Sequence, residues 1–139
     1  MTTFELSHFD DFLAIASQQS EPQKLLLVLA KRELPHGHTE EQARAFAEGH
    51  GGHLAPLAGI DKQPSELEGF TAFVEEAKQV GSEWDAVFVA ALPGTGDRLP
   101  STKEIDDAIE KVIHAIRNGM INNLLVFDRS GTPLQINHG

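Results

Sequence analysis

Apolar residues recur along this chain at two spacings, and the spacing separates expected helices from expected strands. Three segments carry apolar residues three or four positions apart, which is the period of an amphipathic helix. These segments are Phe9–Ala16, Phe70–Ala77 and Ile105–Ile116. A fourth and more polar helix is predicted over Thr39–Glu48, with Ala43, Phe46 and Ala47 as its apolar side.

Polar residues just before these segments predict where the helices begin. In a capping box, a Ser or Thr side chain accepts a hydrogen bond from the backbone three residues on, and the side chain there accepts one in return. The pairs that fit are Thr39 with Gln42, Ser65 with Glu68, and Ser101 with Glu104. Ser7 is a candidate cap for the first helix.

Continuous apolar runs between the helices predict strands. Leu25–Ala30 and Ala86–Leu92 contain no polar position, which is typical of central strands covered on both faces. Leu124–Phe127 is a third run of this kind. His53–Ile60 is predicted as an edge strand, because Pro56 cannot donate a hydrogen bond to a neighbouring strand.

The end of the chain predicts a hairpin. Asp128–Gly131 is a turn sequence, with Asp first and Gly last, and it would fold Thr132–Asn137 back as an antiparallel strand. The elements then follow in the order αβαβαβαββ. We therefore expect a single α/β domain over residues 1–139, with a mostly parallel sheet and a C-terminal antiparallel hairpin.

The composition of the chain excludes several classes of function and says less about the fold. The chain has 11 Lys and Arg against 21 Asp and Glu, a formal net charge of −10, which argues against nucleic-acid binding. It has no Cys, which excludes disulfides, thiolate metal sites and thiol catalysis. The longest aliphatic run, Leu25–Ala30, is far shorter than the roughly 20 residues that span a bilayer. No signal peptide is visible, so we expect a cytoplasmic protein without membrane contact.

The loop between the third predicted strand and the last predicted helix is the first candidate binding site. In parallel sheets, ligands bind beyond the carboxyl ends of the strands, and glycines let backbone N–H groups approach an anion. The candidate residues are Gly94, Thr95, Gly96, Asp97 and Arg98, with Lys103 as a further cation. The loop matches neither a Walker sequence nor a dinucleotide fingerprint, and a plain connection rich in turn formers is the alternative.

Two other strand ends would add cations to this site. If the first, third and fourth strands are neighbours, their polar ends meet at one rim. The residues there are Lys31, Arg32, His36 and His38 after the first strand, and Asp128 and Arg129 after the fourth. Such a rim would bind a small anion, such as a nucleotide or a phosphorylated metabolite.

Four histidines flank the second predicted helix and are weak candidates for metal ligands. They are His36, His38, His50 and His53. Ten helical residues would separate the two pairs by about 15 Å, which is too far for one ion. Each pair alone falls short of the three or four protein ligands usual for zinc. We therefore expect solvated histidines and no cofactor, with a two-histidine site between subunits as the alternative.

Structural roles are expected for the remaining residues that could take part in catalysis. Asp106, Glu110 and His114 follow at intervals of four, but they lie opposite the isoleucine stripe and should face water. Trp84, just before an apolar run, is predicted to anchor the core or an interface. Hydrolysis has no support, since the chain lacks a Gly-x-Ser-x-Gly elbow and a His-Glu-x-x-His pair.

Four segments of the chain resemble a family of small proteobacterial proteins. They are Leu25–Pro35, Glu48–Gly52, Trp84–Leu92 and Phe127–Gly131. Members of that family are labelled as an alpha subunit of ribonucleotide reductase, so the resemblance implies nucleotide reduction. That chemistry needs a thiyl radical and a reducing dithiol, whereas this chain has no Cys and no Tyr. We predict that the chain is not the catalytic subunit of such an enzyme.

Two functional hypotheses remain from the sequence. The preferred one is a non-catalytic binding or self-associating module, whose partner is another protein or a second copy of the chain. The alternative is small-anion binding, with or without catalysis, at the Gly94–Arg98 loop and the strand ends.

Overall fold

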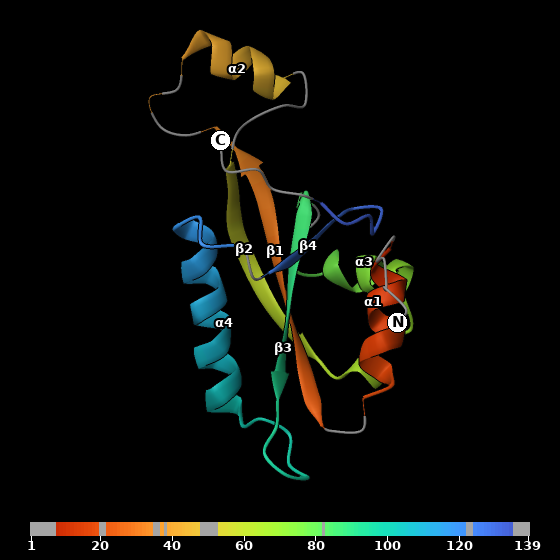
Figure 1. Ribbon diagram of the computed structural model, residues 1–139. Helices are drawn as coiled ribbons and strands as arrows, with labels where there is room; N and C mark the ends of the chain where they lie inside the picture. Colours follow the sequence, from red (N-terminus) through yellow and green to blue (C-terminus); the bar gives the residue numbers. More distant parts are fainter. Residues whose placement is uncertain are drawn as a thin grey trace, which may run out of the picture.

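The computed structural model describes residues 8–19, 22–34, 37, 39–47, 53–81, 83–121 and 124–134. The helices are α1 (Phe9–Ser17), α2 (Glu40–Ala47), α3 (Phe70–Ala77) and α4 (Thr102–Arg117), with a short 3-10 helix η1 (Pro64–Glu66). The strands are β1 (Gln23–Glu33), β2 (His53–Lys62), β3 (Ala86–Pro93) and β4 (Leu125–Asp128). Helices and strands alternate in the order that the sequence predicts (Figure 1).

The direction of the strands differs from the prediction. The four strands form one sheet in the order β2-β1-β3-β4. Each neighbouring pair is antiparallel, so the predicted mostly parallel sheet is wrong.

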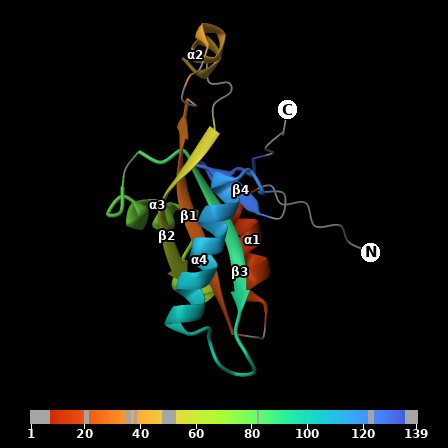
Figure 2. The ribbon, with the colours of Figure 1, turned by 90° about the vertical axis from the view of Figure 1, so that its left-hand side faces the viewer.

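The connections between the strands explain this difference. The chain between β1 and β2 carries α2 beyond the end of the sheet instead of across its face, so β2 returns antiparallel to β1 (Figures 1 and 2). The connection through α3 then joins β2 to β3, which run in the same direction on opposite sides of β1. Alternating helices and strands produce a parallel sheet only when each helix returns the chain along the sheet to a neighbouring strand.

β1 is the central strand, and its apolar run is buried on both faces as predicted. Leu25, Leu27 and Leu29 belong to the core under α1 and α3. The alternate residues Leu26, Val28 and Ala30 belong to the core under α4. All six side chains are buried, so two separate cores pack against the two faces of this one strand.

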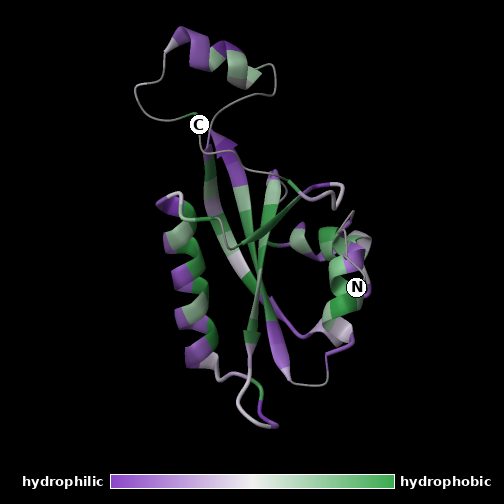
Figure 3. Cartoon of the chain, viewed as in Figure 1, coloured by the Kyte–Doolittle hydropathy of each residue, from purple (hydrophilic) through white to green (hydrophobic). Residues whose placement is uncertain are grey.

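α4 covers one face of the sheet with the predicted isoleucine stripe. Ile105, Val112 and Ile116 are buried, and Figure 3 shows the apolar side of the helix turned to the sheet. A Cβ atom on Gly59 of β2 would lie 2.6 Å from the Cγ2 atom of Ile109, so a glycine at this position lets α4 approach β2 closely. Within the described part of the chain, no helix is long and apolar enough to cross a membrane.

The two edges of the sheet are formed differently. β2 is an edge strand, as predicted for His53–Ile60. It contains a β-bulge: Ala58 pairs with Leu29 and Pro56 pairs with Ala30, which leaves Leu57 as an extra residue. At the opposite edge, the described chain turns after β4 and runs back along that strand.

The turn after β4 has the predicted form. The Gly131 N–H donates to the Asp128 carbonyl at 3.0 Å, and the Leu134 N–H donates to the Val126 carbonyl at 2.8 Å. Residues 132–134 therefore return antiparallel to β4. The remainder of the predicted strand Thr132–Asn137 lies outside the described residues.

The predicted capping boxes of α2 and α4 are confirmed. The Gln42 N–H donates to Thr39 Oγ1 at 3.1 Å, and the Thr39 N–H donates to the Gln42 side chain at 2.8 Å. Ser101 and Glu104 exchange the same pair of hydrogen bonds, each 3.2 Å long. Both interactions are local, which is why the sequence predicts them.

The predicted starts of the other two helices need correction. α1 is capped by His8, whereas Ser7 lies outside the described residues. Ser65 falls inside η1, and α3 begins only at Phe70, after Gly69. The Ser65–Glu68 capping box is therefore wrong, because Pro64 starts a single 3-10 turn that ends before the apolar stripe.

Candidate functional site

The antiparallel sheet divides the predicted anion-binding rim between its two ends. Ala30 pairs with Ala86, which pairs with Asp128, so β1 and β4 end at the same end of the sheet. β3 ends at the opposite end, where Pro93 pairs with Gln23. Lys31, Arg32 and Arg129 therefore lie at one end of the sheet, and Gly94–Arg98 with Lys103 at the other (Figure 1).

The Gly94–Arg98 loop closes on itself through its backbone. Thr95 and Arg98 exchange two N–H to carbonyl hydrogen bonds of 3.1 Å, and the Gly94 N–H donates to the Pro22 carbonyl at 2.9 Å. A Cβ atom on Gly94 would lie 1.8 Å from the Arg98 carbonyl oxygen, and Gly96 has φ +61°. Both glycines thus serve the turn, and three of the loop's N–H groups, those of Gly94, Thr95 and Arg98, are bonded to carbonyl oxygens.

The pocket beside this loop is lined partly by acidic side chains. It has a volume of about 630 Å³ and lies between the loop and the first turn of α4. Asp97 and Glu104 line it together with Arg98 and Ser101. The Glu104 N–H, at the helix N-terminus, is bonded to Ser101 Oγ. This pocket therefore offers an anion one guanidinium group, with two carboxylates nearby.

At the other end of the sheet, Lys31 and Arg129 engage their side chains in contacts, and Arg32 engages its backbone. Lys31 Nζ lies 3.2 Å from Glu83 Oε2. The Arg32 backbone N–H donates to Asp85 Oδ2 at 2.8 Å, which ties β1 to the start of β3. The Arg129 guanidinium lies 5.4 Å from the centre of the Trp84 ring, a cation–π contact.

Trp84 is part of the core, as predicted. It is buried and makes edge contacts with Phe70 and Phe73 of α3. Its indole Nε1 has no hydrogen-bond partner among the described residues. The ring therefore acts through its apolar faces.

Of the four histidine candidates, only His53 lies within the described residues. His53 is exposed at the start of β2, while His36, His38 and His50 lie outside the described residues. Over the residues that are described, no cluster of three or more His, Asp or Glu side chains could hold a metal ion.

The outer face of α4 is solvated, as predicted. Asp106, Glu110, His114 and Arg117 are all exposed. Asn118 Nδ2 donates to the His114 carbonyl at 2.7 Å, so the polar contact at this end of the helix closes its last turn. These side chains form a surface and not a site.

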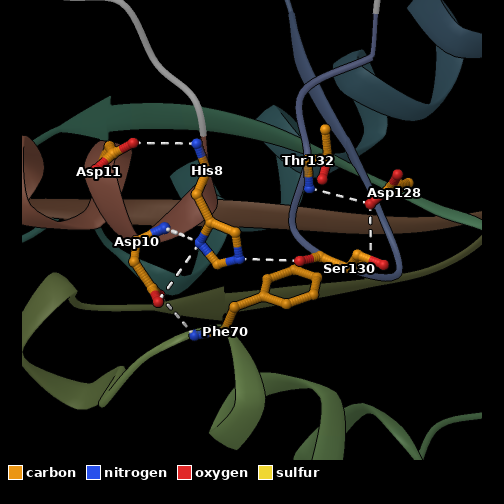
Figure 4. A network of polar contacts seen from close by, with 7 residues as sticks. All are labelled: His8, Asp10, Asp11, Phe70, Asp128, Ser130 and Thr132. Carbon is orange, nitrogen blue, oxygen red and sulfur yellow. Dashed lines mark hydrogen bonds and ion pairs between the residues drawn. The ribbon is translucent and has the colours of Figure 1, made fainter.

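A polar cluster that the sequence did not predict joins α1, α3 and the turn after β4 (Figure 4). His8 Nδ1 accepts the Asp10 N–H at 3.0 Å and so caps α1. The other ring nitrogen, Nε2, lies 2.9 Å from the Ser130 carbonyl oxygen. Asp10 Oδ1 accepts the Phe70 N–H at 2.8 Å, at the first residue of α3.

This cluster contains Asp, His and Ser, but its hydrogen bonds rule out a catalytic triad. His8 Nδ1 accepts a backbone N–H, and a carbonyl oxygen only accepts, so the proton is on Nε2. A general base needs a free lone pair facing the hydroxyl that it deprotonates. Here Nε2 faces the Ser130 backbone and not its hydroxyl, so the cluster lacks the geometry of a triad and connects three segments.

The turn after β4 is shaped around the His8 ring. Asp128 Oδ1 accepts the N–H groups of Ser130 and Thr132 at 2.8 and 3.0 Å. Gly131 has φ +83°, and a Cβ atom there would lie 2.5 Å from His8 Nε2. The His8 N–H donates to Asp11 Oδ2 at 3.1 Å, and this spacing of three is the signal in the sequence that could have identified the cap.

An apolar groove, which the sequence also did not predict, lies on the sheet beside the end of α3. It has a volume of about 380 Å³ and is lined by Leu29 and Leu57–Ala58 from the sheet and by Val80 from the segment after α3. Leu57 is 49% exposed and Val80 is 50% exposed. Lys31 and Glu83 stand at its rim. We call this feature the Leu57 groove.

Carboxylates pair with the lysine that lines the groove and with two lysines on neighbouring elements. Besides Lys31 with Glu83, Lys78 lies 2.9 Å from Glu75 Oε1, and Lys62 is bonded to Glu76. The bond to Glu76 raises the pKa of Lys62 above its ordinary value. Each of these lysines therefore has a carboxylate partner, and in the Lys31 and Lys78 pairs the carboxylate is the more exposed member.

Comparison with protein-family models, with curated proteins and with solved structures finds no match for this chain. The resemblance to the proteobacterial family therefore stays a prediction.

Proposed function

We propose that this chain is a non-catalytic module that binds another protein at the Leu57 groove and the adjoining edge of β2. The observation that carries the proposal is the exposure of Leu57 and Val80, at 49% and 50%, within one groove. The polar candidates are engaged elsewhere: the Gly94–Arg98 loop bonds to itself, and His8 bonds to two backbone segments.

The hydrophobic effect favours the binding of a partner in this groove. Apolar surface in water costs about 25 cal/mol per Å², which is recovered when a partner covers it. Single exposed aliphatic residues are common, whereas exposed aliphatic side chains that line one groove form a candidate interaction site. Leu57 and Val80 line one groove together with the buried Leu29.

Charge favours a different protein over a second copy of the chain. Each copy carries a formal net charge of −10, so two copies repel each other at low ionic strength. The small-anion hypothesis lacks comparable support, because the N–H groups of Gly94, Thr95 and Arg98 are bonded to carbonyl oxygens.

The proposal is tested by capturing partners from an extract of the cells that make this protein. Three immobilised forms of the full chain are compared: the unchanged chain, the double variant Leu57→Lys/Val80→Lys, and the control Leu125→Lys. Leu125 is 38% exposed on β4, away from the groove. Circular dichroism and thermal unfolding verify that all three are folded.

We expect at least one protein that binds the unchanged chain and the control but not the double variant. This protein should form a complex of defined stoichiometry with the purified chain, as measured by native mass spectrometry. The same proteins bound to all three forms would refute the proposal. Turnover of a substrate in a hydrolase and phosphatase screen, lost in Asp97 or Arg98 variants, would also refute it.

A further inference from the structure

We infer that the partner is an extended polypeptide segment, carrying Lys or Arg and at least one aliphatic side chain, that adds to the sheet beside β2. This inference rests on the proposed function and specifies what occupies the groove. Three features of the described residues carry it: a free strand edge, an adjoining apolar groove, and the balance of charge.

The backbone of β2 favours an extended segment over a helix. β2 has 10 residues and stands at the edge of the sheet, with no strand of the described chain on its outer side. Such an edge presents unpaired N–H and carbonyl groups, which another strand can bond directly. A helix has already bonded its own backbone groups, so it leaves this edge unsatisfied.

The local form of β2 sets the length of the added segment. Proteins protect sheet edges with charges, prolines and bulges, and β2 has Pro56 and the bulge at Leu57 in its first half. Pro56 cannot donate a hydrogen bond, so it limits regular pairing to Leu57–Lys62. At about 3.3 Å per residue, this stretch pairs with about six residues of a partner.

The side chains of such a segment would reach the groove. Alternate residues of a strand face the same side of a sheet, so every second side chain of the added segment lies over the face that carries Leu57 and Val80. The groove volume of about 380 Å³ is at the lower end of binding-site volumes. The groove is chemically suited to an aliphatic side chain, because its walls include the apolar residues Leu29, Leu57, Ala58 and Val80.

The charge balance favours a basic segment. In the ion pair that lines the groove, the carboxylate is the more accessible member: the Glu83 side chain is 79% exposed against 41% for Lys31. Outside the groove lining, Glu75 of α3 is likewise 67% exposed against 53% for Lys78. The net charge of −10 adds a long-range attraction for a cationic partner.

The test is a selection of random 12-residue peptides displayed on phage against the full chain at low salt. We expect enriched sequences in which Val, Ile or Leu alternate with Lys or Arg, and in which Asp, Glu and Pro are rare. A synthetic copy of an enriched peptide should bind the unchanged chain and the Leu125→Lys control equally. It should bind Leu57→Lys/Val80→Lys at least tenfold more weakly.

A second form of the peptide tests strand addition directly. Methylating alternate backbone nitrogens of the enriched peptide removes the N–H donors that pair with β2, while the side chains stay the same. We expect methylation on the bonding side to weaken binding at least tenfold and methylation on the outer side to leave it unchanged. Equal binding of both methylated forms would show that the peptide does not pair with the edge.

Several outcomes overturn the inference. They are no enrichment, enrichment of acidic or helical peptides, binding that is insensitive to Leu57→Lys/Val80→Lys, and a homodimer that this double variant makes monomeric. If the cell extract still yields a groove-dependent protein, the inference fails while the proposed function stands. If the double variant retains every captured protein, the proposed function itself fails.

Discussion

Glu66 shows how one backbone hydrogen bond acts on a surface carboxylate. Its Oε1 atom accepts the Gln63 N–H at 2.9 Å and lies 3.6 Å from Lys24 Nζ. Both contacts favour the charged form, and the Gln63 N–H is the stronger cause. Together they hold the pKa of Glu66 below its ordinary value. The charged carboxylate therefore stabilises the folded chain.

This shift predicts how stability depends on pH. The contribution of Glu66 is present above its unfolded pKa, about 4.3, and is lost as pH falls through the lower folded value. We expect Glu66→Gln to lower the free energy of unfolding at pH 7 and to have a smaller effect at pH 3. Urea unfolding at the two pH values measures this.

The matched control for Glu66 is an acidic side chain on the outer face of α4. Glu110 is exposed and points away from the sheet, so Glu110→Gln should change the pH dependence less than Glu66→Gln. An equal effect of Glu66→Gln at pH 3 and pH 7 would contradict the prediction.

His8 shows that a residue's role depends on distant segments. The sequence places it before an apolar stripe, and the structure uses its ring to cap α1 and to contact the Ser130 carbonyl. The two residues are 122 positions apart, so no local pattern connects them. The spacing of three between His8 and Asp11 can be recognised in the sequence. The contact of His8 with the turn after β4 cannot.

At the scale of elements, α1 and α3 are joined by a cap that one helix supplies to the other. The residue before α3, Gly69, has no side chain to cap it. Asp10 of α1 accepts the Phe70 N–H instead, at 2.8 Å. The N-terminus of α3 is thus stabilised by a residue 60 positions away.

This arrangement predicts that α3 depends on Asp10. Asp10→Ala leaves the Phe70 N–H without its acceptor and should cost about 1 kcal/mol, within the range measured for lost caps. Asp10→Asn keeps an acceptor oxygen and should cost less. Chemical unfolding gives the free energies, and amide hydrogen exchange at residues 70–73 should speed up in Asp10→Ala.

Asp106→Ala is the control for this effect. Asp106 is exposed on α4, beyond its first turn, and the change should stay within about 0.5 kcal/mol. If Asp10→Ala lowered the free energy of unfolding no more than this control does, the cap between the two helices would not contribute to stability.

At the scale of the whole molecule, the negative charge opposes the compact state. The formal net charge is −10, and the ion pairs, such as Lys31 with Glu83, lie at partly exposed positions where each contributes about 0–1 kcal/mol. Self-repulsion between charges should therefore outweigh these pairs at low ionic strength.

Salt should accordingly stabilise the chain. Raising NaCl from about 10 mM to about 150 mM shortens the Debye length from about 30 Å to about 8 Å, which screens distant repulsion more than close pairs. We expect the midpoint of thermal unfolding to rise over this range. A fall would mean that the ion pairs dominate the electrostatic free energy. Sucrose at matched osmolality serves as the control for non-electrostatic effects.

The sequence by itself determined the features that arise within a few residues. The apolar run of β1, the isoleucine stripe of α4 and the Ser101–Glu104 box follow from helix and strand periods, and each is confirmed. The turn at Asp128–Gly131 belongs to the same class. Sequence reasoning succeeds here because the interacting groups lie at most four positions apart or share one periodic face.

Only the tertiary structure decided the direction of the strands and hence the candidate site. Whether β2 returns antiparallel beside β1 depends on where the chain carries α2. The alternation of helices and strands along the sequence is compatible with both a parallel and an antiparallel return. The antiparallel pairing of β3 with β4 separates Arg129 from the Gly94–Arg98 loop, and the edge position of β2 leaves the Leu57 groove open. The physical reason is that strand pairing is a long-range interaction, while periodicity records only which face of an element is buried.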